Sequence, residues 1–84
     1  MSQPATANVR PLAGLPVGSR ATIASFDLPD DTHQRLLEMG LLPGAECRVE
    51  RYAPLGDPLE IKVRGFRLSL RASEAAGIRV APLA

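Results

Sequence analysis

Residues 53–71, APLGDPLEIKVRGFRLSLR, decide the fold. Apolar residues alternate with polar ones in two successive runs, and these apolar residues are Leu59, Ile61 and Val63, then Phe66, Leu68 and Leu70. Alternation with period two predicts strands that have one buried face and one exposed face. Gly65 lies between the runs, where a tight bend needs a residue without a side chain. The stretch predicts two paired strands with Phe66 on the buried face.

The first part of the stretch, 53–58, predicts the bend of a β-hairpin rather than a chemical site. Prolines keep the loop out of the strand ladder, a glycine allows a positive φ, and an aspartate can accept hydrogen bonds from nearby backbone N–H groups. We expect Tyr52 and Leu59 to flank this bend, which would set the strand register. The residues with this structural role are Pro54, Gly56, Asp57 and Pro58.

Three further segments predict strands, at 19–26, 45–50 and 78–82. They too place apolar residues on one face and polar residues on the other. About five short strands with one apolar face predict a mainly β chain with one short α-helix. Closure into a small barrel would bury that face and protect the strand edges. An SH3-like barrel is the first choice, and an oligonucleotide-binding-type barrel is the second.

The sequence DLPDDTHQRLLEMG, ending at Gly40, predicts a helix of about two turns. Asp31 and Gln34 have the spacing of a capping pair, and the two leucines that follow would face the sheet. Gly40 would end the helix in a left-handed conformation, with Leu41 folding back onto the last turn. The helix must be held by the sheet, because so short a helix is unstable alone.

The length of 84 residues allows one domain with a thin core. We expect a flexible N-terminal tail at 1–10 and the barrel domain at 11–84, with a single helical turn at 72–77. Leu12, Leu15 and Val17 are expected to seal one end of the core. A chain of this size has little room for an enclosed enzyme cleft. Any site would be shallow or shared with a partner.

Charge and composition narrow the class of protein. Ten cations oppose nine anions, and Lys62 is the only lysine. A dedicated nucleic-acid binder usually has a larger basic excess, so no nucleic-acid partner is expected. No apolar stretch approaches the roughly 18 residues of a membrane span, so no direct membrane insertion is expected. The lone Cys47 excludes an intramolecular disulfide and suits the reducing cytoplasm.

The sequence offers few residues for metal binding or catalysis. His33 and Cys47 are the usual nitrogen and sulfur ligands, and neither has a second ligand at close spacing. Cys47 lies on the face of its strand that is expected to be buried, and His33 is expected at the rim of the core. Asp30 and Asp31 suit the N-terminus of a helix better than paired-carboxylate catalysis. We therefore assign no catalytic residue, no metal ligand and no cofactor.

Four groups of residues together resemble the FeoA family of small cytosolic proteins of bacterial ferrous iron uptake. They are Leu12, Leu15, Gly18, Ala21 and Ile23; RLLEMGLLPG at 35–44; APLGDPLEIKVRGFRLSLR at 53–71; and EAAGIRV at 74–80. The resemblance implies an SH3-like barrel and a partner, the membrane permease FeoB with its cytosolic GTP-binding domain. Transition-metal binding is a family-level label, and no ligand cluster of this chain matches it.

The resemblance leads to the hypothesis of a non-enzymatic accessory protein that docks on the cytosolic part of the permease. The expected docking residues form an apolar run longer than a short helix needs: Met39, Gly40, Leu41 and Leu42. The alternative for Leu41 and Leu42 is that they plug the barrel mouth.

Other functions and assemblies stay open on the sequence. One alternative is a small nucleic-acid-binding or regulator-type SH3-like barrel, and another is a metal-binding chaperone that uses His33 and Cys47. Edge pairing or strand exchange would also allow homo-oligomers.

Overall fold

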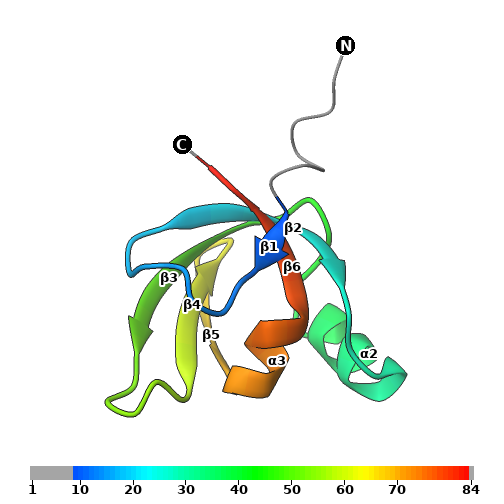
Figure 1. Ribbon diagram of the computed structural model, residues 1–84. Helices are drawn as coiled ribbons and strands as arrows, with labels where there is room; N and C mark the ends of the chain where they lie inside the picture. The colour runs from blue at the N-terminus through cyan, green and yellow to red at the C-terminus, as the bar shows by residue number, and fades with distance from the viewer. Residues whose placement is uncertain (1–8, 84) are drawn as a thin grey trace.

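The computed structural model describes residues 9–83, which form one six-stranded sheet and two helices (Figure 1). The strands are β1 (Arg10–Pro11), β2 (Arg20–Phe26), β3 (Glu46–Tyr52), β4 (Leu59–Val63), β5 (Phe66–Leu70) and β6 (Ile78–Pro82). The helices are α2 (Asp30–Glu38) and α3 (Ala72–Gly77). The mainly β architecture confirms the predicted class, with one strand more than expected.

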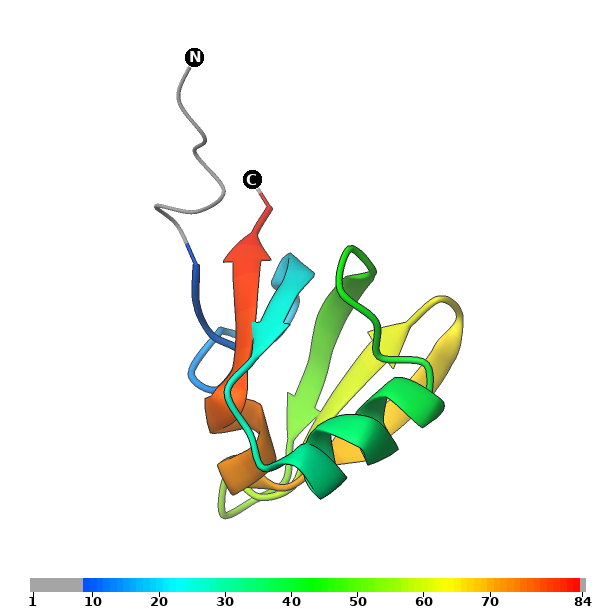
Figure 2. The ribbon, with the colours of Figure 1, turned by 90° about the vertical axis from the view of Figure 1, so that its right-hand side faces the viewer.

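The strands are arranged in the order β1-β6-β2-β3-β4-β5, and every neighbouring pair is antiparallel. The sheet coils strongly, so that α2 crosses one end of it (Figure 2). The strand that the sequence did not predict is β1, in which Arg10 lies opposite Val80. Arg10 belongs to the segment predicted as a tail, while residues 1–8 of that segment lie outside the described residues. Pro11 fits this strand because β1 is at the edge of the sheet.

The core lies inside the curved sheet and confirms the period-two pattern. Its buried apolar residues come from the strands, the helices and the loops beside them: Leu12, Leu15, Ala21, Ile23, Leu36, Leu41, Ala45, Cys47, Val49, Leu59, Ile61, Val63, Leu68, Leu70, Ala75, Ile78 and Val80. Residues between the inward positions of a strand, such as Arg48 and Lys62, are exposed. Burial of this apolar face is the main stabilising contribution to the fold.

Two residues predicted to be inside are exposed. Val17 is 61% exposed, because it lies in a turn closed by the N–H of Ser19 and the carbonyl of Pro16 at 3.1 Å. Phe66 is 37% exposed. It begins β5 directly after the turn at Arg64 and Gly65, so its ring lies at the rim of the sheet instead of in the core.

Helix α2 ends as predicted but begins differently. Gly40 has a φ of +100°, and the N–H groups of Gly40 and Leu41 each donate to the last turn of the helix at 3.0 Å. These two hydrogen bonds form a Schellman motif. The motif requires a left-handed conformation at Gly40, which costs a glycine little conformational energy. The predicted capping pair is absent, because the helix begins at Asp30 and Asp31 lies inside it. The Gln34 side chain instead donates to Glu38 at 3.2 Å.

Candidate functional site

The end of α2 and the turn after it form an apolar patch at the rim of the sheet. Leu42 is 39% exposed, and Met39 is half-buried against the core. The ring of Phe66 covers Gly40 so closely that a Cβ atom added there would lie 2.9 Å from the ring Cζ atom. Met39 and Leu42 flank Gly40 in the chain, and Phe66 covers it. We call these three residues the rim patch.

The predicted docking run needs one correction and one addition. Leu41 is fully buried, because the Schellman motif turns its side chain back into the core, so it cannot present a surface to a partner. Leu41 is therefore a core residue, Leu42 is 39% exposed, and docking through this run stays a prediction. Phe66 lies beside this run in the structure and was not predicted there, since the alternation of its strand placed it on the buried face. Its position directly after a two-residue turn was the available signal.

An ion pair connects α2 to α3. The guanidinium of Arg35 contacts the Glu74 carboxylate, which is 8% exposed. The other oxygen of Glu74 accepts a hydrogen bond from the N–H of Arg71 at 3.0 Å, at the start of α3. A nearly buried carboxylate needs such partners to offset its desolvation. The last turn of α2, which precedes the rim patch, is therefore connected to α3.

The loop 53–58 has the geometry of the predicted bend. Tyr52 lies opposite Leu59, and the N–H of Ala53 donates to the carbonyl of Pro58 at 3.0 Å. Gly56 has a φ of +85°. Asp57 accepts a hydrogen bond from the N–H of Ala72 at 3.0 Å, which ties the loop to the first residue of α3 instead of to its own backbone. That the loop carries no chemistry of its own stays a prediction.

His33 and Cys47 are not arranged as metal ligands. The His33 ring stacks on Phe26, with 4.7 Å between the ring centroids. Cys47 is buried, and burial together with the smaller effect of the neighbouring Glu46 charge raises the pKa of its thiol to about 11. Burial therefore opposes the thiolate form that a metal ligand needs. Residues 9–83 contain no group of three His, Cys, Asp or Glu side chains that could hold a metal ion.

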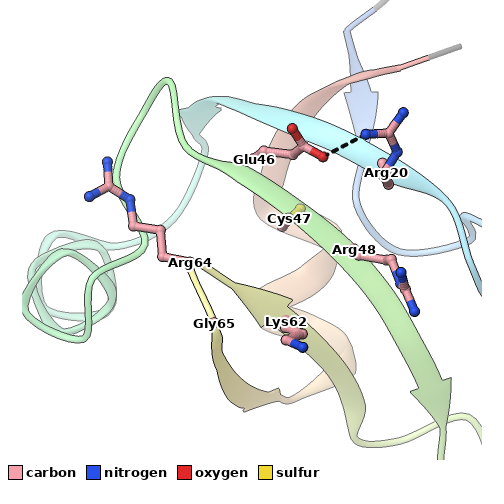
Figure 3. A pocket seen from close by; sticks show the side chains of 7 residues that line it. All are labelled: Arg20, Glu46, Cys47, Arg48, Lys62, Arg64 and Gly65. Atoms are coloured by element: carbon pink, nitrogen blue, oxygen red, sulfur yellow. Dashed lines mark hydrogen bonds and ion pairs between the residues drawn. The ribbon is translucent and has the colours of Figure 1, made fainter.

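An open hollow of about 410 Å³ lies on the outer side of the sheet (Figure 3). It is lined by Arg20, Glu46, Cys47, Arg48, Lys62, Arg64 and Gly65. Within it the Arg20 guanidinium pairs with the Glu46 carboxylate at 3.0 Å. The hollow is rich in cations and was not predicted, because it depends on which strands lie side by side.

In the part of the chain that is described, neither helix has the length and apolar character needed to cross a membrane. The candidate surfaces of residues 9–83 are the rim patch and the basic hollow.

Comparison with known proteins identifies the family. The FeoA domain model matches residues 10–82. The chain is 35% identical over 69 residues to an Fe(2+) transport protein A/Fe(2+) transporter FeoB fusion protein of Porphyromonas gingivalis, covering 82% of this chain. The aligned part spans 8% of that fusion protein.

Solved structures give the same result. The FeoA protein of Chlorobium tepidum is 42% identical with a TM-score of 0.84, and the match covers 88% of this chain and 70% of that one. The zinc-complexed FeoA of Stenotrophomonas maltophilia, described as a prokaryotic SH3 domain protein, is 32% identical with a TM-score of 0.74 and coverages of 87% and 94%. The SH3-like fold is thereby confirmed, and the chain belongs to the FeoA family, which is associated with ferrous iron transport.

Proposed function

We propose that this chain is a non-enzymatic accessory protein of ferrous iron uptake that docks, in the cytoplasm, on the GTP-binding part of an FeoB-type permease. The observation that carries the proposal is the Porphyromonas gingivalis protein, in which an FeoA part and an FeoB part share one polypeptide. Fusion holds two modules at a high effective concentration. A separate FeoA chain needs a binding surface to achieve the same association.

The rim patch is the surface that we assign to this docking. Exposed apolar residues that cluster on a small protein tend to mark interfaces. Leu42 and Phe66 are both more than one third exposed, and they flank the glycine that ends α2. The Schellman turn and the pair between Arg35 and Glu74 hold this end of the molecule in place. Little conformational entropy would be lost there on binding.

A non-enzymatic role fits the chemistry of the candidate residues. The Cys47 thiol is protonated and buried, so it is a poor nucleophile. The His33 ring stacks on Phe26 and is not among the residues that line the hollow. An effect on the permease would therefore come from binding itself.

The test is co-purification of the full chain with the cytosolic part of its permease. Leu42→Glu should abolish binding, because it places a charge in the apolar contact, while leaving the melting temperature nearly unchanged. Leu55→Glu is the matched control, since Leu55 is 96% exposed on the 53–58 loop and should bind as wild type. Unchanged binding by Leu42→Glu would refute the rim patch. Failure of the wild-type chain to bind would refute the docking function.

A further inference from the structure

The strand register places four cations in one continuous row across the sheet. Arg20 of β2 lies opposite Arg48 of β3, Arg48 lies opposite Lys62 of β4, and Lys62 lies opposite Arg67 of β5. Directly opposed residues share a face of the sheet, and all four residues are exposed. Neighbouring strands are about 4.8 Å apart, so the row is about 14 Å long. We call it the basic row.

Fold stability does not explain the basic row. Like charges directly opposite each other destabilise a sheet, and the row contains three such pairs in succession. Carboxylates reduce the charge repulsion only in the β2–β3 half of the row. Glu46 lies 3.0 Å from Arg20, and Glu50 lies 3.2 Å from Arg48. Among residues 9–83, the ion pairs include neither Lys62 nor Arg67. The β4–β5 half of the row therefore keeps its charge free for a partner.

The surface beside the row is concave. The hollow of about 410 Å³ is lined by three members of the row, Arg20, Arg48 and Lys62, and by Arg64 of the β4–β5 turn. Arg20, Arg48 and Lys62 come from three neighbouring strands, and Arg64 comes from the turn beside them (Figure 3). A chain segment lying across the strands could place side chains in the hollow while contacting Arg67 at the end of the row.

We propose that the basic row binds an acidic segment of a protein partner, whose carboxylates pair with Lys62 and Arg67 and enter the hollow. Guanidinium groups bind carboxylates through two parallel hydrogen bonds, which gives geometric specificity as well as attraction. The inference deepens the proposed docking function and rests on it for the identity of the natural partner. It adds the chemistry of a second contact, on a different face from the rim patch.

A protein partner fits this surface better than a nucleic acid. The net charge of the chain is only +1, whereas binding of a phosphate backbone usually relies on a marked basic excess. Binding of single strands also relies on aromatic stacking. The three aromatic residues are placed elsewhere: Phe26 stacks on His33, Tyr52 hydrogen-bonds to Leu15, and Phe66 covers Gly40. Interleaved charges of both signs suit a protein surface with complementary charges.

The test measures binding of a fluorescently labelled poly-glutamate peptide to the full chain by anisotropy at low salt. Lys62→Glu should weaken binding by about tenfold or more, because it reverses the charge at the centre of the row. Arg10→Glu is the matched control, since it changes the net charge equally but lies on β1, at the opposite edge of the sheet. It should bind nearly as wild type, and binding should fall as salt is added.

Three results would overturn the inference. The first is absence of peptide binding by the wild-type chain at low salt, and the second is an equal loss of binding in Arg10→Glu and Lys62→Glu. The third is tighter binding of single-stranded DNA or of phosphatidylserine vesicles, lost in Lys62→Glu, which would assign the row to those ligands. The peptide assay contains no permease, so its outcome is independent of the test of the docking function.

Discussion

The hydroxyl of Tyr52 donates a hydrogen bond to the backbone carbonyl of Leu15 across 2.6 Å, and it accepts one from the N–H of Gly14 at 3.2 Å. This one side chain joins the end of β3 to the loop between β1 and β2. That loop carries Leu12 and Leu15 into the core. The hydroxyl thus satisfies backbone groups that no strand ladder pairs.

Tyr52→Phe should therefore lower the free energy of unfolding by about 1 kcal/mol, because it removes the hydroxyl and keeps the ring. For a domain of this size such a loss lowers the melting temperature by about 4–8 °C. Urea denaturation and thermal melting both measure it. An unchanged stability would mean that water replaces the hydroxyl at no cost.

Gly40→Ala should destabilise the chain more than Gly56→Ala. Both glycines have a positive φ, +100° and +85°, so each alanine is strained by about 1–2 kcal/mol. At Gly40 the new methyl group would also meet the Phe66 ring at 2.9 Å, whereas the space around Gly56 is open. The half-exposed ring can shift, so we expect an excess of about 1 kcal/mol, at the low end of overpacking costs.

Equilibrium unfolding of both alanine variants, made also in a Phe66→Leu background, separates the two effects. The excess at Gly40 should disappear in that background, and the cost at Gly56 should stay. Equal costs for the two glycines in the wild-type background would contradict the close contact with Phe66.

Cys47 should make the stability of the chain depend on alkaline pH. Its thiol has a pKa raised by burial to about 11 in the folded state, against 9.0 for an ordinary thiol. Below about pH 9 both states hold the proton, and the stabilisation is complete. As the pH rises from 9 toward 11 the unfolded chain loses the proton first, so about 2–3 kcal/mol of stability should be lost.

Comparison of wild type with Cys47→Ala across this pH range isolates the contribution of the thiol from those of other titrating groups. The difference in unfolding free energy between the two proteins should shrink as the pH rises. A constant difference would show that the Cys47 thiol ionises equally easily in the folded chain.

Lys62→Glu should raise the melting temperature although it removes a binding residue. The substitution converts the like-charge contacts with Arg48 and Arg67 into attractive ones, each worth about 0.2–1 kcal/mol. Lys62→Gln removes only the repulsion and should give an intermediate value. Added salt should reduce both effects. A lower stability of Lys62→Glu at low salt would contradict the like-charge geometry of the basic row.

Much of the fold follows from local patterns in the sequence. Alternation over 59–70 predicts β4 and β5, and Gly40 predicts the end of α2, because these features depend on neighbouring residues alone. The prediction was wrong at the start of α2, because Asp31 lies inside the helix and does not cap it. It was also wrong at Phe66, which is exposed although the alternation of its strand placed it on the buried face. Alternation along a strand predicts which face a side chain is on, but it does not predict whether the core extends as far as that residue.

The candidate surfaces could be predicted only in part. Met39 and Leu42 stand out as apolar residues beyond the needs of a short helix, and the structure leaves both at the rim. Leu41 is an apolar residue of the same run, but the Schellman motif turns its side chain into the core. Phe66 is 26 positions after Gly40 in the chain, and its ring lies against Gly40. No local pattern in the sequence indicates this contact.

The sequence by itself determined the class of fold, the strand faces and the family, because period-two alternation, a helix-ending glycine and turn residues act over a few positions. Apart from the pairing of Tyr52 with Leu59, which the 53–58 loop predicts, only the tertiary structure decided which residues lie opposite each other, since register depends on the bulges in β2 and β3 and on the hairpin turns together. That register places Lys62 between Arg48 and Arg67, and so turns scattered cations into one basic row.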